Sequence, residues 1–382
     1  MIPSRAFFLT LLANALFWLS LQSLFPVLPL YVASLGGTPA DNGLATLAAA
    51  GMAVLSRMFI GTLADRVGRR PVMVIGGVIS IVAPILYTVA HAIPVVLMGS
   101  ALRGIGIAAF TTGFQALLAD LAPPERRGEV LGWGGNSTAL AALVGPLAGD
   151  WITSHQGFPV AFSVAAATGV LCALVSLLIR EPSREARRAI STPPLRGLQE
   201  TLALPNVRAG IAAVSPMGMA FGAMVTFWPL VAQQHRLNTI GAFYSVYALG
   251  QLTVQTLAGR LSDRIGRSRV MLPGMLLTGI AFAAIPLARS DAASLLVAFA
   301  CGAGLGIART AIDALVLDGA PITLRGTVVA LEFTLNDVWI GLGSALLGSL
   351  ASAAGYNATY AVAGAMCVVM AGALFAFKQR RW

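Results

Sequence analysis

The feature that most constrains this chain is a succession of long apolar stretches running from its first residues almost to its last. A helix that crosses a bilayer needs about 20 mostly apolar residues. Twelve stretches reach that length, at residues 6–34, 41–64, 71–90, 94–119, 128–153, 157–179, 206–234, 239–261, 269–288, 292–317, 326–352 and 355–377. Continuous apolar runs differ from the ten-residue alternation of a membrane β-barrel. We therefore predict an all-α integral membrane protein with twelve transmembrane helices.

Composition excludes the main alternatives. Charged residues make up 10% of the 382 residues, against about 25% in an ordinary soluble domain, and hydrophobic residues make up 57%. A soluble enzyme, a disulfide scaffold and a disordered chain are therefore not expected. Cys172, Cys301 and Cys367 are isolated within apolar stretches, which predicts small buried side chains. We expect no metal site, no phosphate-binding loop and no cofactor.

The basic residues predict the orientation of the chain. If the N-terminus is cytoplasmic, 20 of the 25 Lys and Arg residues fall on cytoplasmic ends and loops. Only Arg236 and Arg289 fall on the outer side, and the other three lie within spans. This bias follows the positive-inside rule and predicts a multi-pass protein of the bacterial inner membrane with both termini in the cytoplasm. The net charge of +10 is spread over many short loops, so nucleic acid is not an expected partner.

An internal repeat divides the chain in two. GTLADRVGRRPVM begins at Gly61 and GRLSDRIGRSRVM at Gly259, an offset of 198 with eight identities in thirteen positions. At the same offset, the segment from Phe114 matches the segment from Ile312 at seven of fifteen positions. A polar, Arg-rich linker at 181–205 separates the copies, which predicts bundles of six helices at 1–180 and 206–382. An even number of spans in each half predicts a parallel repeat.

The first copy resembles the loop 2–3 signature of the major facilitator superfamily, with key positions at Gly61, Leu63, Asp65, Arg66, Gly68, Arg69 and Arg70. The resemblance covers the whole chain. It implies two six-helix bundles related by a parallel pseudo-twofold repeat, alternating access, a monomer, and a small-molecule substrate as partner.

The resemblance also implies a conformational latch in which Asp65, Arg69 and Asp120 cluster at the inner helix ends. The repeat predicts a second latch of Asp263, Arg267 and Asp318. The alternative is that these residues are topogenic charges and turn formers. Independently of the family, we expect Gly61 to allow close helix approach and Gly68 to permit a tight turn.

Residues 132–150 on the fifth span resemble the fifth-span signature of the family's antiporters, with Gly145, Pro146 and Gly149 in place. A Gly-Pro break kinks a membrane helix and allows close packing. In the family this signature accompanies export, while the alternative is a role in packing alone.

The acidic residues well inside the spans are Asp313, Glu332 and Asp337, all in the second half. Glu332 is about 10 Å and Asp337 about 17 Å from the inner end of its span. Carboxyl groups at such depths are candidates for proton coupling. Arg309 and Asp313 are four residues apart and can pair, so a structural ion pair is the alternative. The first span contains no acidic residue, which predicts that any coupling lies in the second half.

Polar and aromatic residues on four spans are candidates for the substrate cavity. In the family, spans 1, 4, 7 and 10 line that cavity. The candidates are Asn14, Trp18, Gln22, Arg103, Gln115, Met217, Phe221, Trp228 and Arg309. Packing is the alternative for each Met and aromatic residue. Arg103 takes the place of the Gln in the family's fourth-span pattern, and a buried cation faces a cavity or a partner.

The leading hypothesis is a secondary transporter that exports small amphipathic organic molecules by proton antiport. The first rival is a proton-coupled importer of an organic anion that uses Arg103 and Arg309. The second is a non-transporting membrane sensor or assembly partner. No feature of the sequence predicts an enzyme.

Overall fold

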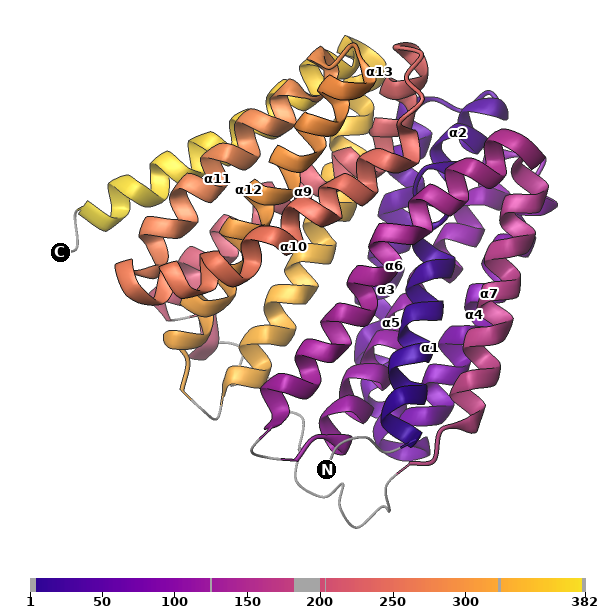
Figure 1. The fold of residues 1–382 in the computed structure, drawn as a ribbon, viewed down its shortest axis with the longest axis horizontal. Coiled ribbons are helices and arrows are strands. Elements are labelled where there is room, and N and C mark those ends of the chain that lie inside the picture. Colours follow the sequence, from indigo (N-terminus) through magenta and orange to yellow (C-terminus); the bar gives the residue numbers. More distant parts are fainter. Residues whose placement is uncertain (1–4, 124–125, 182–199, 203, 322–323, 380–382) are drawn as a thin grey trace. The chain divides into compact units, whose positions relative to one another are not determined.

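The computed structural model describes residues 5–123, 126–181, 200–202, 204–321 and 324–379. Most of the expected linker therefore lies outside the described residues. Within these ranges the regular secondary structure is helical and contains no strand. The all-α fold predicted from the apolar stretches is confirmed (Figure 1).

The chain forms two compact units. The first comprises Met1–Gly37 and Leu47–Ser191, and the second comprises Thr38–Thr46 and Thr192–Trp382. The helices of the first half are α1 (Arg5–Gln22), α2 (Val27–Ser34), α3 (Pro39–Val67), α4 (Arg69–Thr88), α5 (Ile93–Leu121), α6 (Arg127–Gln156) and α7 (Phe158–Leu178). Those of the second half are α9 (Pro205–Gln234), α10 (Ile240–Ile265), α11 (Arg267–Ala284), the short 3₁₀ helix η3 (Ile285–Leu287), α12 (Asp291–Asp318) and α13 (Arg325–Gln379).

The helices correspond to the predicted stretches, with one correction. The first stretch is not a single helix, because four turn residues at 23–26 separate α1 from α2. Pro26 has no N–H group to continue the ladder of α1. In the second half, α13 covers two predicted stretches, 326–352 and 355–377. Gly355 has the non-helical angles φ 79° and ψ 175° and divides α13 into two helical segments.

Among the described residues, nine helices are long and apolar enough to cross a membrane. In that count α13 is one helix despite the break at Gly355, and α6 and α10 are not included. The number of twelve crossings therefore stays a prediction, while the multi-helix membrane character is clear.

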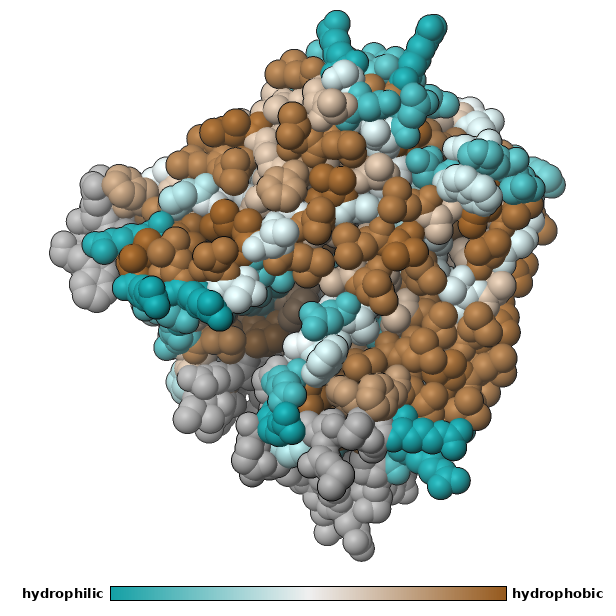
Figure 2. Space-filling model, viewed as in Figure 1, coloured by the Kyte–Doolittle hydropathy of each residue, from teal (hydrophilic) through white to brown (hydrophobic). Residues whose placement is uncertain are grey.

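Large apolar side chains cover the sides of the helices. On α3, Leu55 is 64% exposed and Met58 and Phe59 are each 77% exposed. Figure 2 shows apolar residues over the flanks of the helices and hydrophilic residues gathered near helix ends. Exposed apolar surface of this extent is unfavourable in water and favourable against lipid acyl chains.

Close helix contacts repeat at the offset found in the sequence. A Cβ atom added to Gly104 on α5 would meet the carbonyl of Ala49 on α3. A Cβ atom added to Gly302 on α12 would meet the carbonyl of Tyr247 on α10. Both pairs differ by 198, so the duplication predicted from two loop motifs extends to the packing of the membrane helices. A further pair at this offset is Gly76 against Phe110 and Gly274 against Ala308.

The three cysteines are free and fully buried, in α7, α12 and α13. The thiol of Cys172 lies 3.4 Å from the carbonyl oxygen of Ala13 on α1. The prediction that these residues are small buried side chains is confirmed.

Candidate functional site

A cluster of charged and polar side chains joins α12 to α13 in the second unit. Arg309 lies at its centre, with Nε 2.8 Å from Oδ1 of Asp313 on the same helix. Nη2 of Arg309 lies 3.2 Å from Oε1 of Glu332 on α13. Nη1 donates a hydrogen bond of 3.3 Å to Oδ1 of Asn336, one turn further along α13. The guanidinium group therefore contacts three different side chains.

The two carboxylates of this cluster differ in environment. The side chain of Glu332 is 4% exposed, whereas that of Asp313 is 47% exposed. The two carboxyl groups also interact with each other. The ring of Phe333 lies beneath the guanidinium group of Arg309, 5.4 Å from its carbon to the ring centroid. One cation thus faces two carboxylates, and the fully charged cluster has a net charge of −1.

The sequence predicted part of this arrangement. Arg309 and Asp313 form the ion pair that their four-residue spacing predicts. The contributions of Asn336 and Phe333 were missed, because polar and aromatic residues at helical spacing are common and carry little signal. Asp337 follows Asn336 directly and is partly buried, and its proposed proton-coupling role stays a prediction.

Arg103 is a partly buried cation of the first unit, on α5. Its Nε atom is shielded from solvent and has no hydrogen-bond partner among the described residues. It interacts electrostatically with Tyr87 of α4. The hydroxyl oxygen of Tyr87 lies 3.2 Å from that of Ser100, one turn before Arg103. Gln115, the other candidate on this helix, is exposed.

The polar candidates of α1 contact α6. Asn14 is fully buried, and its Nδ2 donates to the hydroxyl oxygens of Ser137 at 2.7 Å and Thr138 at 2.9 Å. Gln22 is 7% exposed and packs against Gly145. Both side chains therefore join helices within the first unit, and Oδ1 of Asn14 is left without a hydrogen-bond partner among the described residues.

The glycines of the fifth-span signature provide the space for this contact. A Cβ atom on Gly145 would lie 3.2 Å from Cβ of Gln22, and one on Gly149 would meet the backbone carbonyl of Ser23. Pro146 lies inside α6, where its missing N–H leaves one carbonyl of the helix without its usual donor. The signature thus sits against the turn that separates α1 from α2.

The aromatic and Met candidates divide into two groups. Trp228 is fully buried, stacks on Phe243 at 3.9 Å and donates from Nε1 to the carbonyl oxygen of Ile240 at 3.0 Å. Met217 is 4% exposed and lies in the hydrophobic core of the second unit. Trp18 and Phe221 remain partly exposed. The last two are better placed to contact a solute than the first two.

The first predicted latch is assembled. Nη1 of Arg69 lies 2.6 Å from Oδ1 of Asp65, and its Nε lies 3.7 Å from Oδ2 of Asp120. The side chain of Arg69 is only 9% exposed. Because the three residues come from the ends of α4, α3 and α5, the cluster ties three helices of one unit together.

The second latch repeats the first at the same offset. Nε of Arg267 lies 2.8 Å from Oδ2 of Asp318, and its Nη1 forms an ion pair with Asp263. These residues join the ends of α11, α12 and α10. The geometry of both clusters agrees with the expectation drawn from the repeat, and their role in conformational change stays a prediction.

Gly68 has φ 111° and immediately precedes α4, which confirms the expected turn. A carboxylate occupies this helix end: the backbone N–H of Arg70 donates to Oε1 of Glu181, just beyond α7. Sequence reasoning placed Glu181 in the linker and missed this capping role. Gly61 differs from expectation, because among the described residues no atom lies within 4 Å of a Cβ added there. Arg66 is exposed beside this turn.

A family model described as the Major Facilitator Superfamily matches residues 10–243 and 217–381. The synaptic vesicular amine transporter of Mus musculus is 24% identical over 338 residues, or 87% of this chain. The matched region spans only 65% of that relative's length. The multidrug resistance protein MdtG of Salmonella paratyphi A is 24% identical over 371 residues, which cover 93% of this chain and 90% of MdtG.

Solved structures share the fold. A mutant of the nucleoside transporter NupG superimposes with a TM-score of 0.81 at 12% identity, over 97% of this chain and 99% of that protein. A bacterial homologue of the human lysosomal transporter Spinster gives a TM-score of 0.78 at 18% identity, over 98% of this chain and 96% of that homologue.

Proposed function

Because the chain belongs to the Major Facilitator Superfamily, we propose that it is a secondary transporter that exports small amphipathic organic molecules in exchange for protons. The relative MdtG, a multidrug resistance protein, supports export, since it aligns over 93% of this chain. The vesicular amine transporters are consistent with an organic substrate. The distribution of basic residues supports an inner-membrane location with cytoplasmic termini.

The observation that carries the proton coupling is the charge of the cluster around Arg309. Two carboxylates face one guanidinium group, and Glu332 is almost fully buried. Uncompensated charge is unfavourable at membrane depth. The cluster therefore accommodates one additional positive charge, which a proton supplies on the Glu332–Asp313 pair.

Coupling follows because a proton and a cationic substrate group compete for the net negative charge of the cluster. A proton neutralises the cluster, whereas loss of that proton restores a net charge of −1 that attracts a cationic or strongly polarised substrate group. Binding of one then disfavours binding of the other, which is the requirement for exchange. In this mechanism, Asp313 is the solvent-accessible entry point for protons and Glu332 the buried acceptor.

The cluster around Arg69 and the cluster around Arg267 lie at helix ends. Each holds three helices of its own unit through ion pairs at least partly shielded from water. We propose that they stabilise one conformation in the alternating-access cycle and separate in another. We propose, from the family resemblance, that the protein operates as a monomer.

Arg103 supports a second candidate, the import of an organic anion with a proton. Arg309 is already paired with two carboxylates, so it is poorly suited to bind an anionic substrate. Arg103 retains a buried nitrogen without a hydrogen-bond partner in the described chain. A carboxylate on the substrate would satisfy it.

The test is transport by purified protein in proteoliposomes, with a panel of cationic, neutral and anionic compounds and an imposed pH gradient. The Glu332→Gln variant keeps the size of the side chain and removes its ability to release a proton. We expect at least a tenfold loss of gradient-driven transport, while exchange of labelled for unlabelled substrate continues.

The matched control is Glu129→Gln, since Glu129 pairs with Arg126 at an exposed site of α6, outside the cluster. It should transport like the wild type. Gradient-driven transport by Glu332→Gln at the wild-type rate would refute proton coupling at this cluster. Preferential uptake of anions, lost in Arg103→Gln, would favour import.

A further inference from the structure

A cavity of about 300 Å³ lies in the second unit, away from the cluster around Arg309. Three interruptions of the helices meet there: the end of α9, the 3₁₀ turn η3, and the break at Gly355 in α13. Its volume is at the lower end of the range for small-molecule sites. The predicted topology places this end of the unit on the non-cytoplasmic side.

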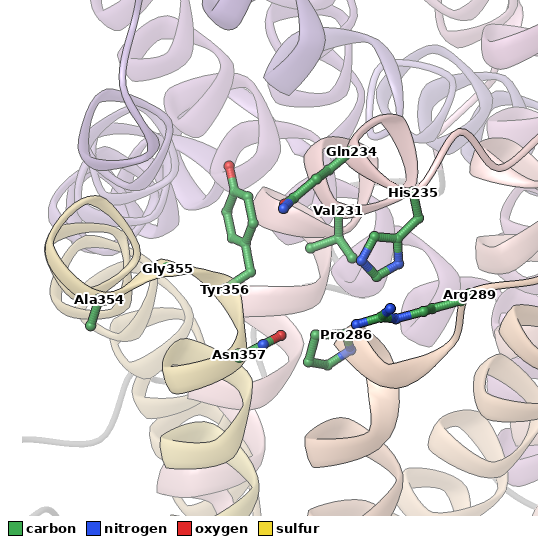
Figure 3. A pocket seen from close by; sticks show the side chains of 9 residues that line it. All are labelled: Val231, Gln234, His235, Pro286, Arg289, Ala354, Gly355, Tyr356 and Asn357. Carbon is green, nitrogen blue, oxygen red and sulfur yellow. The ribbon is translucent and has the colours of Figure 1, made fainter.

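The polar side chains around this cavity are predominantly hydrogen-bond donors. They come from all three segments, and Figure 3 shows them grouped around one space: Gln234, His235, Arg289, Tyr356 and Asn357. None of the lining residues carries a carboxylate. The cavity is therefore positively charged through Arg289.

Arg289 is an exposed residue of the cavity lining. Within the described residues, it forms no ion pair with an acidic side chain. The nearest acidic residue in the sequence, Asp291, is instead held by loop residues, with Oδ1 accepting a hydrogen bond of 2.9 Å from the backbone N–H of Asn238. The guanidinium group of Arg289 thus remains available for a planar anionic group, the partner that its geometry matches.

His235 is a second polar residue of the cavity lining, and a hydrogen bond to the backbone holds its ring in place. Its Nδ1 lies 3.0 Å from the carbonyl oxygen of Ala288. Because a carbonyl only accepts, Nδ1 carries the proton in this contact, and Nε2 donates a hydrogen bond to an anion when the ring is doubly protonated. The same bond ties the loop after α9 to the residue that precedes Arg289.

We propose that this cavity binds an anionic group, a carboxylate or phosphate, between Arg289, His235 and Asn357. The group could belong to a soluble organic anion or to a lipid headgroup, and both present the same charged oxygens. Leu287, two residues before Arg289, is 70% exposed and would lie against acyl chains. A bound anion would bridge α9, the loop before α12 and the last segment of α13, and would stabilise the unit.

The experiment measures the thermal stability of the purified transporter in detergent during titration with inorganic phosphate or citrate, with sodium chloride at matched ionic strength as reference. We expect a saturable rise in Tm for the wild type. Arg289→Gln and Asn357→Ala should each shift the midpoint of the titration at least tenfold. Arg236→Gln removes the same charge from the same predicted side, outside the cavity lining, and should match the wild type.

The source of the anion is separated by repeating the measurement in nanodiscs of phosphatidylglycerol or phosphatidylcholine. Stabilisation by phosphatidylglycerol that is lost in Arg289→Gln assigns the site to a lipid headgroup, and stabilisation by citrate or phosphate alone assigns it to a soluble anion. The proposal is overturned if no probe stabilises the wild type beyond sodium chloride. It is equally overturned if Arg289→Gln binds like the wild type, or if Arg236→Gln loses as much.

Discussion

Arg309 is held between two carboxylates at a depth where an unpaired charge is strongly unfavourable. Glu332 is 4% exposed and contacts the guanidinium group at 3.2 Å. Removal of one partner of such a pair leaves the other buried without compensation, which typically costs about 3–5 kcal/mol. Replacement of both partners by apolar groups is far less harmful. The stability of the second unit therefore depends on the balance of the cluster more than on the presence of either charge.

A double-mutant cycle tests this balance. Arg309→Met alone should destabilise the protein by about 3 kcal/mol or more, because two carboxylates then repel each other. Arg309→Met combined with Glu332→Gln should recover at least half of that loss. Thermal unfolding of the purified variants provides the comparison. Additive losses in the double variant would show that the residues do not act as a pair.

Sequence reasoning could identify the members of this cluster but not its assembly. Arg309 and Asp313 are four residues apart on one helix, so their contact follows from helical geometry alone. Glu332 is 23 residues beyond Arg309, on the next helix. Its contact depends on how α12 and α13 pack, which the rotation of each helix decides. For the same reason Asn14, a candidate for a cavity, turns out to bind Ser137 and Thr138 on α6.

At the scale of the helices, glycine determines how closely neighbours approach. The contact of Gly104 with the backbone of Ala49 leaves no room for a methyl group. Without a hydrophobic driving force between helices in lipid, such close backbone packing is a main source of their association. Polar links supplement it, as between α1 and α6.

Substitution of Gly104 by Ala should therefore destabilise the protein by about 1–3 kcal/mol, because the backbone of α3 must shift. Gly51→Ala on α3 is the matched control, since a Cβ atom there would meet nothing within 4 Å. It should be neutral or raise stability by up to about 1 kcal/mol through helix propensity. Thermal unfolding in detergent distinguishes them. Equal behaviour of the two variants would contradict the close contact.

The positions of the helices were largely predictable, because apolar length controls them directly. The interruptions were less so. The four turn residues before Val27 fall inside an apolar run, and only Pro26 and Pro29 hinted at a break. The cap on α4 by Glu181 could not be inferred, since 111 residues separate Glu181 from Arg70.

At the scale of the whole molecule, an internal duplication governs helix packing and the charge clusters at the helix ends. Arg69 with Asp65 and Asp120, and Arg267 with Asp263 and Asp318, form the same three-helix cluster at an offset of 198 residues. The charges of the membrane interior do not follow the duplication. Asp313 occupies the position of Gln115, and Arg103 that of Cys301. The helix packing and the helix-end clusters therefore repeat in both halves. The proposed proton-coupling residues lie only in the second half, and Arg103 only in the first.

Asp65→Ala and Asp263→Ala should each reduce transport at least fivefold while expression stays normal, because each removes one ion pair of a helix-end cluster. The retained acids, Asp120 and Asp318, would keep both variants folded. Transport per unit of purified protein is the measurement. Wild-type rates in both variants would show that these residues serve only topology and turn formation.

The repeat was the most informative signal in the sequence, since it carried the cluster that the family resemblance implies for the first half to Asp263, Arg267 and Asp318 in the second half. It could not predict where the halves diverge. Gly145 recurs as Gly343, but Pro146 is replaced by Ser344, whose hydroxyl accepts a hydrogen bond of 3.2 Å from Thr226. Such local replacements depend on neighbours that no repeat specifies.

The burial of all three cysteines has a practical consequence for the study of this molecule. Cys172, Cys301 and Cys367 are fully shielded and unpaired, so thiol reagents in water should leave the native protein almost unlabelled. A cysteine introduced at an exposed loop position would then be the principal reactive group. Membrane-impermeant maleimides applied to intact cells and to inverted vesicles could map the sidedness of each loop on the otherwise native chain.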